Sequence, residues 1–384
     1  MNKSLDVYYE IMGKLRDEGR LRSIPESDRS YAIDLSSNDY LGLAAREDEF
    51  DKELSERFPD AGFTSAASRL LSRRGKYHAQ LEQLISSLFH RKALIFNSGY
   101  HANVGTISSL AQRSTLFLCD KCIHASVIDG LAVGKAEFKR FPHNDIARLE
   151  KILEKESESY RRIIVVVESI YSMDGDLAPL GKIVKLKEKY PDLIIYLDEA
   201  HAFGVRGEKG LGLAEELGLT DQVDIIVGTL GKALASAGAF VVASDIIIDL
   251  LINTSRPFIF STSLPPVCAA RSIIMIEKML SMNNERKRLS TLSGNLRCGI
   301  EKITGKQNNS ESQIIPLTTG DAESAVKLAS ELRANGFDAL PIRRPTVPPG
   351  TERIRFSLNS SLRDDDISSL LSTLETLLPK FLNK

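Results

Sequence analysis

The stretch Leu193-Ile194-Ile195-Tyr196-Leu197-Asp198-Glu199-Ala200-His201 decides the fold of this chain. Its first five residues are apolar and rich in β-branched side chains without polar alternation, which is typical of a strand buried on both faces of a parallel sheet. The run ends at Asp198, and His201 follows three residues later. Ligands of open α/β sheets bind outside the carboxyl ends of strands, so this acid lies where chemistry is expected.

A second strand-like run, residues 223–227, ends shortly before Lys232 in the turn Thr229-Leu230-Gly231-Lys232. Lys232 is surrounded by small and apolar residues, which disfavour the charged ammonium form of its amine. The sequence therefore predicts that two adjacent strand ends offer a carboxylate, an imidazole and an amine.

The segments around these strands alternate between strand-like and helical patterns. We expect strands at residues 93–96, 115–118, 136–141 and 162–168, and helices at residues 76–88, 124–133, 144–156 and 179–189, with a further helix beginning after residues 97–100. Such a βαβ series predicts an α/β fold, with a mostly parallel sheet and helices on both faces.

The pattern changes after residue 261. A helix expected at residues 265–281 leads to the charged run 284–288, and short strands (313–317, 354–358) and helices (322–335, 364–378) follow. An amphipathic helix is expected at residues 4–17, packed on another surface. We predict an N-terminal helical arm (1–36), a large α/β domain (37–283) and a smaller C-terminal α+β domain (284–384).

Composition excludes several classes of protein. The net charge of −1 and the pI near 6.6 do not indicate the excess of positive charge that binding to nucleic acid or an anionic membrane requires. No apolar run approaches the length of a membrane span. There is no secretory h-region and cysteine is sparse, so we expect a cytoplasmic protein. We interpret the cysteines as buried small hydrophobes and expect no metal, because Cys119-x-x-Cys122 has no second pair. No Walker loop, G-x-G-x-x-G or G-x-S-x-G motif is present.

The predicted groups fit one cofactor. Small residues at a helix N-terminus, as in Asn97-Ser98-Gly99-Tyr100, form a phosphate cradle. Pyridoxal 5'-phosphate needs such donors, a lysine for its aldehyde and an acid for its ring nitrogen. Considered alone, Lys232 would be interpreted as a surface lysine, and Asp198 would be interpreted as a helix N-cap after a strand. Their combination favours the cofactor over a nucleotide-binding module without a covalent cofactor.

Seven ordered motifs over nearly the whole chain resemble the α-oxoamine synthases, a family of fold-type I pyridoxal phosphate enzymes. They are SNDYLG (37–42), NSGYHAN (97–103), DKCIHASVIDG (120–130), ESIYSMDGD (168–176), LDEAH (197–201), GTLGKA (228–233) and FSTSLPP (260–266). The resemblance implies a pyridoxal-phosphate-dependent acyltransferase that forms homodimers, with the site at the subunit interface.

The resemblance also implies residue roles. Lys232 would form the Schiff base and later remove the Cα proton of the amino acid, Asp198 would pair with the pyridinium nitrogen, and His124 would stack on the ring and guide the substrate carboxylate. The other implied cofactor contacts are His201 (ring hydroxyl), Ser172 (pocket), the backbone of Gly99 and Tyr100 and the side chain of Thr229 (phosphate), and Thr262 (phosphate of the neighbouring subunit).

Substrate residues are implied elsewhere in the chain. Asn38 and Arg355 match positions near the amino-acid carboxylate, for which a guanidinium is suited. Arg22 and Thr346 match acyl positions, although Arg22 in its basic cluster also fits a solvated face. The segment PTVPPGT (345–351) with Arg353-Ile354-Arg355 is most similar to the members that condense L-alanine with a pimeloyl thioester, on coenzyme A or a carrier protein, in biotin biosynthesis. The alternative is condensation of glycine with acetyl-CoA or another such pair.

Five positions depart from the family pattern. Ala66, Ala67, Ala202 and Ala235 stand where relatives often carry glycine, and each added methyl is expected to affect cofactor entry or loop mobility. Arg344 replaces a common proline and adds a charge near the expected acyl site.

Overall fold

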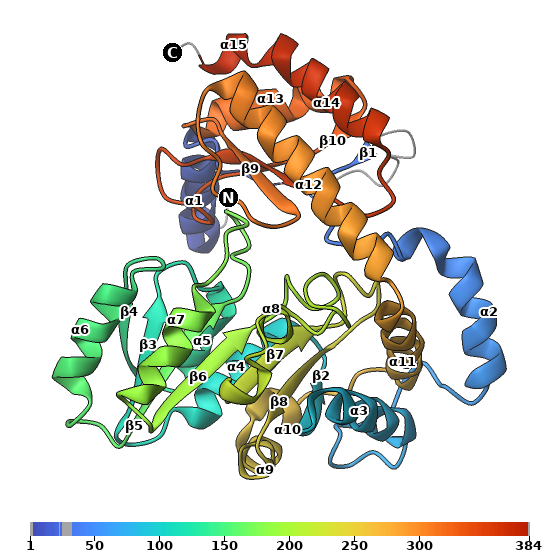
Figure 1. The fold of residues 1–384 in the computed structure, drawn as a ribbon, viewed down its shortest axis with the longest axis vertical. Helices are drawn as coiled ribbons and strands as arrows, with labels where there is room; N and C mark the ends of the chain where they lie inside the picture. The colour runs from blue at the N-terminus through green and yellow to red at the C-terminus, as the bar shows by residue number, and fades with distance from the viewer. Residues whose placement is uncertain (1–2, 23, 25–32, 383–384) are drawn as a thin grey trace. The chain divides into compact units, whose positions relative to one another are not determined.

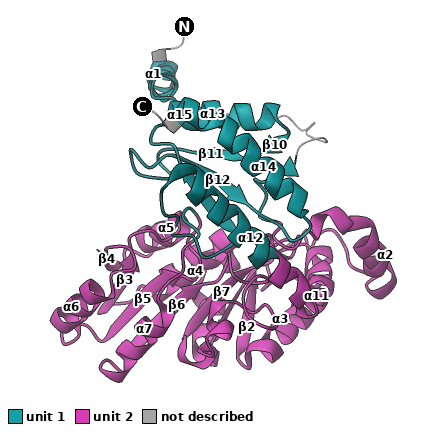
Figure 2. Cartoon of the chain, turned by 45° about the horizontal axis from the view of Figure 1, so that its top comes forward, with its two compact units in different colours: residues 1–38, 173–175, 289–384 teal, residues 39–172, 176–288 magenta. Residues whose placement is uncertain are grey.

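The computed structural model describes residues 3–22, 24 and 33–382 (Figure 1). The chain groups into two compact units, which Figure 2 distinguishes by colour. Unit 1 comprises residues 1–38, 173–175 and 289–384, and unit 2 comprises residues 39–172 and 176–288. The division into an arm and two domains at residues 36 and 283 stays a prediction, and residues 25–32 of that arm lie outside the described residues.

Unit 2 contains a seven-stranded sheet with the order β2-β8-β7-β6-β5-β3-β4. The strands are β2 (Lys92–Phe96), β3 (Thr115–Asp120), β4 (Glu137–Phe141), β5 (Arg162–Glu168), β6 (Leu193–Asp198), β7 (Ile225–Thr229) and β8 (Ala239–Ala243). Strand β8 pairs antiparallel with β2 and β7, and the other pairings are parallel. The predicted mostly parallel α/β sheet is confirmed, whereas β8 was not predicted.

Unit 2 also contains helices. They are α2 (Glu47–Arg57), α3 (Lys76–Phe89), α4 (Gly99–Leu110), α5 (Ala125–Val133), α6 (Ile146–Glu156), α7 (Leu180–Lys185), α8 (Leu213–Glu216), α9 (Asp245–Thr254), α10 (Arg256–Ile259) and α11 (Pro266–Leu280), with 3-10 turns at Ala44–Arg46, Leu186–Glu188 and Thr220–Gln222. Apolar residues of α4, α5, α9 and α10 pack with strand residues such as Phe117, Val166 and Val227 in one buried cluster. No helix within the described ranges is long and apolar enough to cross a bilayer.

Four strands of this sheet end in buried polar residues. Asp120, Glu168, Asp198 and Thr229 close β3, β5, β6 and β7, and none is more than 9% exposed. These four strands run parallel, so their carboxyl ends meet at one edge of the sheet. The apolar residues before each end, such as Leu197 and Val227, are buried on both sides of the sheet and fix the register that brings the polar ends together.

Unit 1 is an α+β unit. Strands β9 (Ile314–Thr318), β12 (Arg353–Ser357) and β11 (Leu340–Ile342) form an antiparallel sheet, and β1 (Ile33–Asp34) pairs parallel with β10 (Phe337–Asp338). The helices are α1 (Asp6–Asp17), α13 (Ala322–Ala334), α14 (Asp364–Leu377) and α15 (Pro379–Leu382), with a 3-10 turn at Lys3–Leu5. Helix α12 (Asn283–Thr304) begins in unit 2 and ends in unit 1. The charged run 284–288 therefore lies at the start of a helix, and unit 2 ends at residue 288.

Two expectations about side-chain burial differ from the structure. Helix α1 is amphipathic as predicted, but its large apolar residues, including Tyr8, Ile11 and Met12, are exposed, so the described residues do not cover its apolar face. Of the cysteines only Cys119 is buried, because it lies inside β3. Cys122 follows that strand in a loop and is exposed, as is Cys298 on α12.

Three of the four alanines that depart from the family pattern fall into two classes. Ala66 and Ala235 have φ angles of +52° and +45°, in the left-handed region that favours glycine. Ala202 has no positive φ and is 0% exposed, so its methyl group is packed. A glycine would relieve backbone strain at the first two positions and remove packing at the third.

We therefore expect Ala235→Gly to raise the free energy of unfolding by about 0.5–1 kcal/mol, because left-handed strain outweighs the entropy that glycine adds to the unfolded chain. Ala202→Gly is the matched control and should lower it by about 1–2 kcal/mol through lost burial and added chain entropy. Urea unfolding of both variants measures these effects, and equal destabilisation by both would contradict the strain at Ala235.

Candidate active site

A lysine, a histidine and a tyrosine are joined at the carboxyl edge of the unit 2 sheet. Lys232 Nζ lies 2.8 Å from His201 Nε2, and His201 Nδ1 lies 2.6 Å from Tyr40 Oη. His201 is buried and Lys232 is partly exposed. Both come from the turns that follow β6 and β7, as the sequence predicted, whereas the role of Tyr40 was not predicted. The amine is thus held beside an imidazole whose far nitrogen is also occupied.

The carboxylate of Asp198 is fixed by two donors. Asn103 Nδ2 donates to Asp198 Oδ2 at 2.8 Å, and the backbone N–H of Ala200 donates to Oδ1 at 2.9 Å. The hydroxyl of Tyr196 donates to Asn103 Oδ1 at 2.6 Å, which settles the orientation of the amide and leaves both of its hydrogens for donation. Asp198 is 5% exposed, so these bonds offset part of the cost of burying it.

The same amide reaches His124, the N-cap of α5. Asn103 Nδ2 also donates to Ser126 Oγ at 2.9 Å, and the Ser126 hydroxyl lies 2.7 Å from His124 Nδ1. His124 Nδ1 also accepts the backbone N–H of Ser126, so the ring carries its proton on Nε2. Burial lowers the pKa of His124, as does the charge of Lys232, although the carboxylate of Asp198 opposes the shift. A neutral imidazole follows.

The residues expected to cradle a phosphate lie at the start of α4. Ser98 is the N-cap and its Oγ accepts the backbone N–H of His101 at 3.3 Å, while Gly99 and Tyr100 are the first helical residues. A Cβ built on Gly99 meets no atom within 4 Å, so the backbone there faces open space. The Thr229 hydroxyl accepts the N–H of Gly231 at 3.3 Å and donates to the carbonyl of Gly238 at the same distance.

Two further predicted cofactor residues lie in loops of unit 2. Ser172 is half-buried in the loop between β5 and α7. Thr262 is exposed, and its carbonyl accepts the side-chain amide of Asn97 at 2.7 Å. The Thr262 side chain is therefore not needed to hold its own loop.

The predicted substrate residues form two pairs within unit 1. Arg355 on β12 is 6% exposed, and its Nη2 donates to Asn38 Oδ1 at 3.2 Å. Arg22 Nη2 donates to Thr346 Oγ1 at 3.1 Å. The fifth departure, Arg344, has its Nε 4.0 Å from Glu352 Oε1, so a buried carboxylate opposes part of its charge.

Sequence reasoning missed the residues that support the site. Tyr40, Asn103, Ser126 and Tyr196 lie within or beside the quoted motifs, but nothing in their spacing says which side chains they meet. Glu168 was also missed. It stands opposite Asp198 in the parallel register, and burial raises its pKa well above the usual range, as does the neighbouring charge of Asp198. Burial and the neighbouring carboxylate of Asp198 therefore both favour the protonated form of Glu168.

This donor set fits pyridoxal phosphate. An amine lies beside an imidazole, a buried carboxylate held by an amide closes the neighbouring strand, and the start of α4 leaves room at Gly99 for an anion. A nucleotide site would need a glycine-rich fingerprint at this sheet edge, and the sequence contains none.

The model of the aminotransferase class I and II family matches residues 31–374. A putative 8-amino-7-oxononanoate synthase of Pasteurella multocida is 43% identical over 96% of this chain and 98% of its own length. The 8-amino-7-oxononanoate synthase of Haemophilus ducreyi is 41% identical over 96% of this chain and 100% of its own length.

Among solved structures, serine palmitoyltransferase from S. paucimobilis with bound PLP-myriocin aldimine has a TM-score of 0.86 at 29% identity, covering 97% of both chains. The expected fold and cofactor class are thereby confirmed, and the alternative of a nucleotide-binding module is set aside. The chain belongs to the aminotransferase class I and II family of fold-type I pyridoxal phosphate enzymes, in the branch of the 8-amino-7-oxononanoate synthases.

Proposed function

We propose that this protein condenses L-alanine with a pimeloyl thioester and releases carbon dioxide, to give 8-amino-7-oxononanoate and the free thiol carrier in biotin biosynthesis. The observation that carries the proposal is the Lys232–His201–Tyr40 chain beside the fixed carboxylate of Asp198. It is supported by two relatives at 43% and 41% identity that bear the name of this synthase.

Pyridoxal phosphate, when bound, supplies an electron sink that stabilises a carbanion at the Cα of the amino acid. Residues of this chain would hold it as follows: Lys232 at the aldehyde, Asp198 at the ring nitrogen, His124 at the ring face, His201 at the ring hydroxyl, Ser172 in the pocket, and Gly99, Tyr100 and Thr229 at the phosphate. Asp198 accepts from Asn103 through one oxygen and from Ala200 through the other, so its orientation is set before the cofactor arrives.

The proton chemistry is assigned to Lys232 and His201. Nζ of Lys232 takes the Cα proton of alanine as a neutral amine and later returns a proton to the product as the ammonium form. His201 Nε2, 2.8 Å from Nζ, is placed to share the proton of the ammonium form. The neutral His124 presents its Nε2–H as a donor, which suits a substrate carboxylate.

The substrate roles and the assembly belong to the same proposal. The Arg355 guanidinium, oriented by Asn38, binds the amino-acid carboxylate, and Arg22 with Thr346 binds the acyl substrate. We propose a homodimer in which the exposed Thr262 reaches the phosphate bound by the neighbouring subunit.

The choice of substrates is tested by offering the PLP-loaded protein alanine or glycine, each with pimeloyl-CoA and acetyl-CoA, and identifying products by mass. We expect 8-amino-7-oxononanoate from alanine and pimeloyl-CoA, at a kcat/KM at least about a hundredfold above the other pairs. Turnover with glycine alone would contradict this proposal and favour a glycine acetyltransferase. A carrier-bound pimeloyl thioester in a parallel reaction distinguishes the two carriers.

The role of Asp198 is tested by Asp198→Asn, which keeps the shape of the side chain but removes its charge. We expect the exchange of the alanine Cα proton for deuterium, followed by NMR, to slow by about 10²–10⁴-fold, because the ring nitrogen loses its anionic partner. Asp192→Asn is the matched control: Asp192 precedes the same strand at its other end and is exposed, so its exchange rate should not change. An unaltered exchange rate in Asp198→Asn would contradict the proposal that Asp198 pairs with the ring nitrogen.

A further inference from the structure

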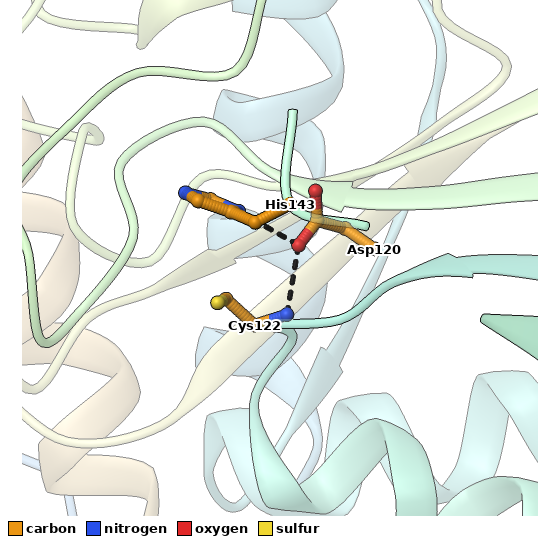
Figure 3. Close-up of side chains that lie close together, drawn as sticks. All are labelled: Asp120, Cys122 and His143. Atoms are coloured by element: carbon orange, nitrogen blue, oxygen red, sulfur yellow. Dashed lines mark hydrogen bonds and ion pairs between the residues drawn. The ribbon is translucent and has the colours of Figure 1, made fainter. Parts of the chain in front are cut away.

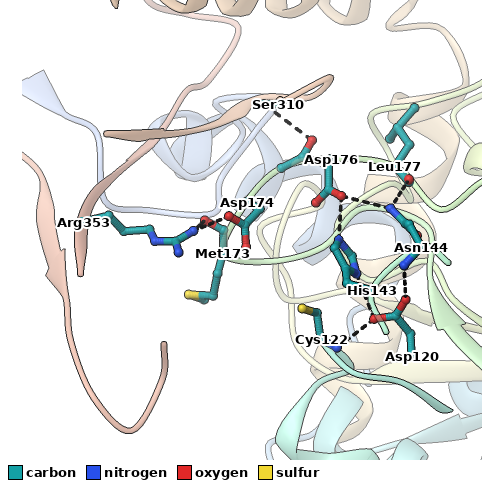
Figure 4. Close-up of polar contacts among 11 residues, drawn as sticks. Asp120, Cys122, His143, Asn144, Met173, Asp174, Asp176, Leu177, Ser310 and Arg353 are labelled. Carbon is teal, nitrogen blue, oxygen red and sulfur yellow. Dashed lines mark hydrogen bonds and ion pairs between the residues drawn. The ribbon is translucent and has the colours of Figure 1, made fainter. Parts of the chain in front are cut away.

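His143, which follows β4, lies between two carboxylates outside the residues assigned to the reaction. Its Nδ1 is 2.8 Å from Asp120 Oδ1 and its Nε2 is 2.7 Å from Asp176 Oδ2 (Figure 4). An ionised carboxylate only accepts hydrogen bonds, so both ring nitrogens carry hydrogen and the ring is an imidazolium. Burial alone lowers the pKa of His143, but the hydrogen bonds to Asp120 and Asp176, with a smaller one to Cys122, raise it to about 12.

A metal ion is the other occupant that this cluster suggests. Asp120, Cys122 and His143 place ligand atoms within 4.8 Å of one another (Figure 3), and these are donor types that zinc accepts. A metal would need the lone pair of His143 Nδ1, where the hydrogen bond to Asp120 already places a proton. A bridging proton therefore accounts for this geometry without a metal.

Each carboxylate belongs to a loop that carries a cofactor residue. Asp120 begins the loop 120–124, which ends at His124, and it accepts the backbone N–H of Cys122 at 2.7 Å and of Asn144 at 2.8 Å. Asp176 belongs to the loop 169–178, which contains Ser172, and its backbone carbonyl accepts the N–H of Tyr171 at 3.0 Å. One imidazolium thus joins both loops.

Neighbouring contacts strengthen the second loop. The side-chain amide of Asn144 donates to Asp176 Oδ2 and to the carbonyl of Leu177, each at 3.0 Å. The ring of Tyr171 meets the His143 ring edge-on, with centroids 4.4 Å apart. Tyr171 directly precedes Ser172, so the ring contact between His143 and Tyr171 also restrains the backbone at Ser172.

The tip of this loop, residues 173–175, is held separately within unit 1. Arg353 donates to the carbonyl of Met173 at 3.2 Å and pairs with the Asp174 carboxylate (Figure 4). The N–H of Glu311 donates to the carbonyl of Gly175 at 3.0 Å. These contacts do not involve His143, so they persist when its charge is removed.

We propose that His143 is a positioning residue of the enzyme: its imidazolium ties the loop 120–124 to the loop 169–178 and so sets His124 and Ser172 for the cofactor. This inference rests on the roles proposed for those two residues. His143 itself touches neither cofactor nor substrate in this assignment.

The test is hydrogen exchange of backbone amides in the full chain, with and without PLP, on His143→Gln. We expect both loops to exchange at least about tenfold faster, because the charged ring is lost and Asp120 and Asp176 keep their negative charge. The affinity for PLP should fall about tenfold and kcat by roughly ten- to hundredfold, with a smaller change in KM.

Two further variants separate positioning from general damage. Asp176→Asn leaves the His143–Asp120 pair intact, so only the loop 169–178 should exchange faster. Cys122→Ser replaces the thiol beside the ring with a hydroxyl, which can also hydrogen-bond, and should leave exchange and PLP affinity unchanged. Because exchange without PLP does not depend on catalysis, these results stand even if the proposed condensation is not found.

Three outcomes would overturn the proposal. Unchanged exchange of both loops in His143→Gln would show that the ring does not hold them. Faster exchange spread evenly over the whole sheet would show a general loss of stability. Stoichiometric zinc binding by the wild type, abolished in Cys122→Ser, would show that the cluster is a metal site.

Discussion

Four parallel strands of unit 2 end in buried polar side chains, and the free-energy cost of burying carboxyl groups there shapes everything around them. For Asp198, this cost is offset by hydrogen bonds from the Asn103 amide and a backbone N–H. For Asp120, it is offset by hydrogen bonds from two backbone N–H groups and the His143 imidazolium. Burial raises the pKa of Glu168, which favours its protonated form. The neighbouring Glu199 accepts the N–H groups of Leu213 and Ala214, and burial raises its pKa to about 7. The burial cost of each carboxyl group is therefore offset by a different set of partners, and at Asp198 the two donors fix the orientation of the carboxylate.

The partners of these carboxyl groups determine the protonation states that the chemistry needs. The chain of hydrogen bonds from Tyr196 through Asn103 and Ser126 leaves His124 with its proton on Nε2. A second chain, from Tyr40 through His201, ends on the amine of Lys232. Both are assembled from residues far apart in the sequence, because parallel strands bring their ends to one edge. This edge of the sheet therefore carries an acid, the imidazole of His201 and an amine without exposing any of them widely.

The sequence was sufficient for what depends on local pattern. The apolar runs at β6 and β7 predicted the strands and the edge that carries Asp198 and Lys232, and the motif order predicted the family. It was insufficient where tertiary neighbours decide. Strand β8 is a short apolar run that periodicity cannot distinguish from a buried helix. The left-handed angle at Ala235 and the exposure of Cys122 depend on backbone geometry. The bridge formed by His143 joins residues from three loops, and no rule of sequence spacing predicts it.

The central claim is that the amine beside His201 holds the cofactor. The most direct measurement is to load the protein with pyridoxal phosphate, reduce the adduct with borohydride, digest it and locate the pyridoxyl group by peptide mass spectrometry. The account predicts a single modified residue, Lys232, in the segment that follows β7. Modification of another lysine, or of none, would contradict it.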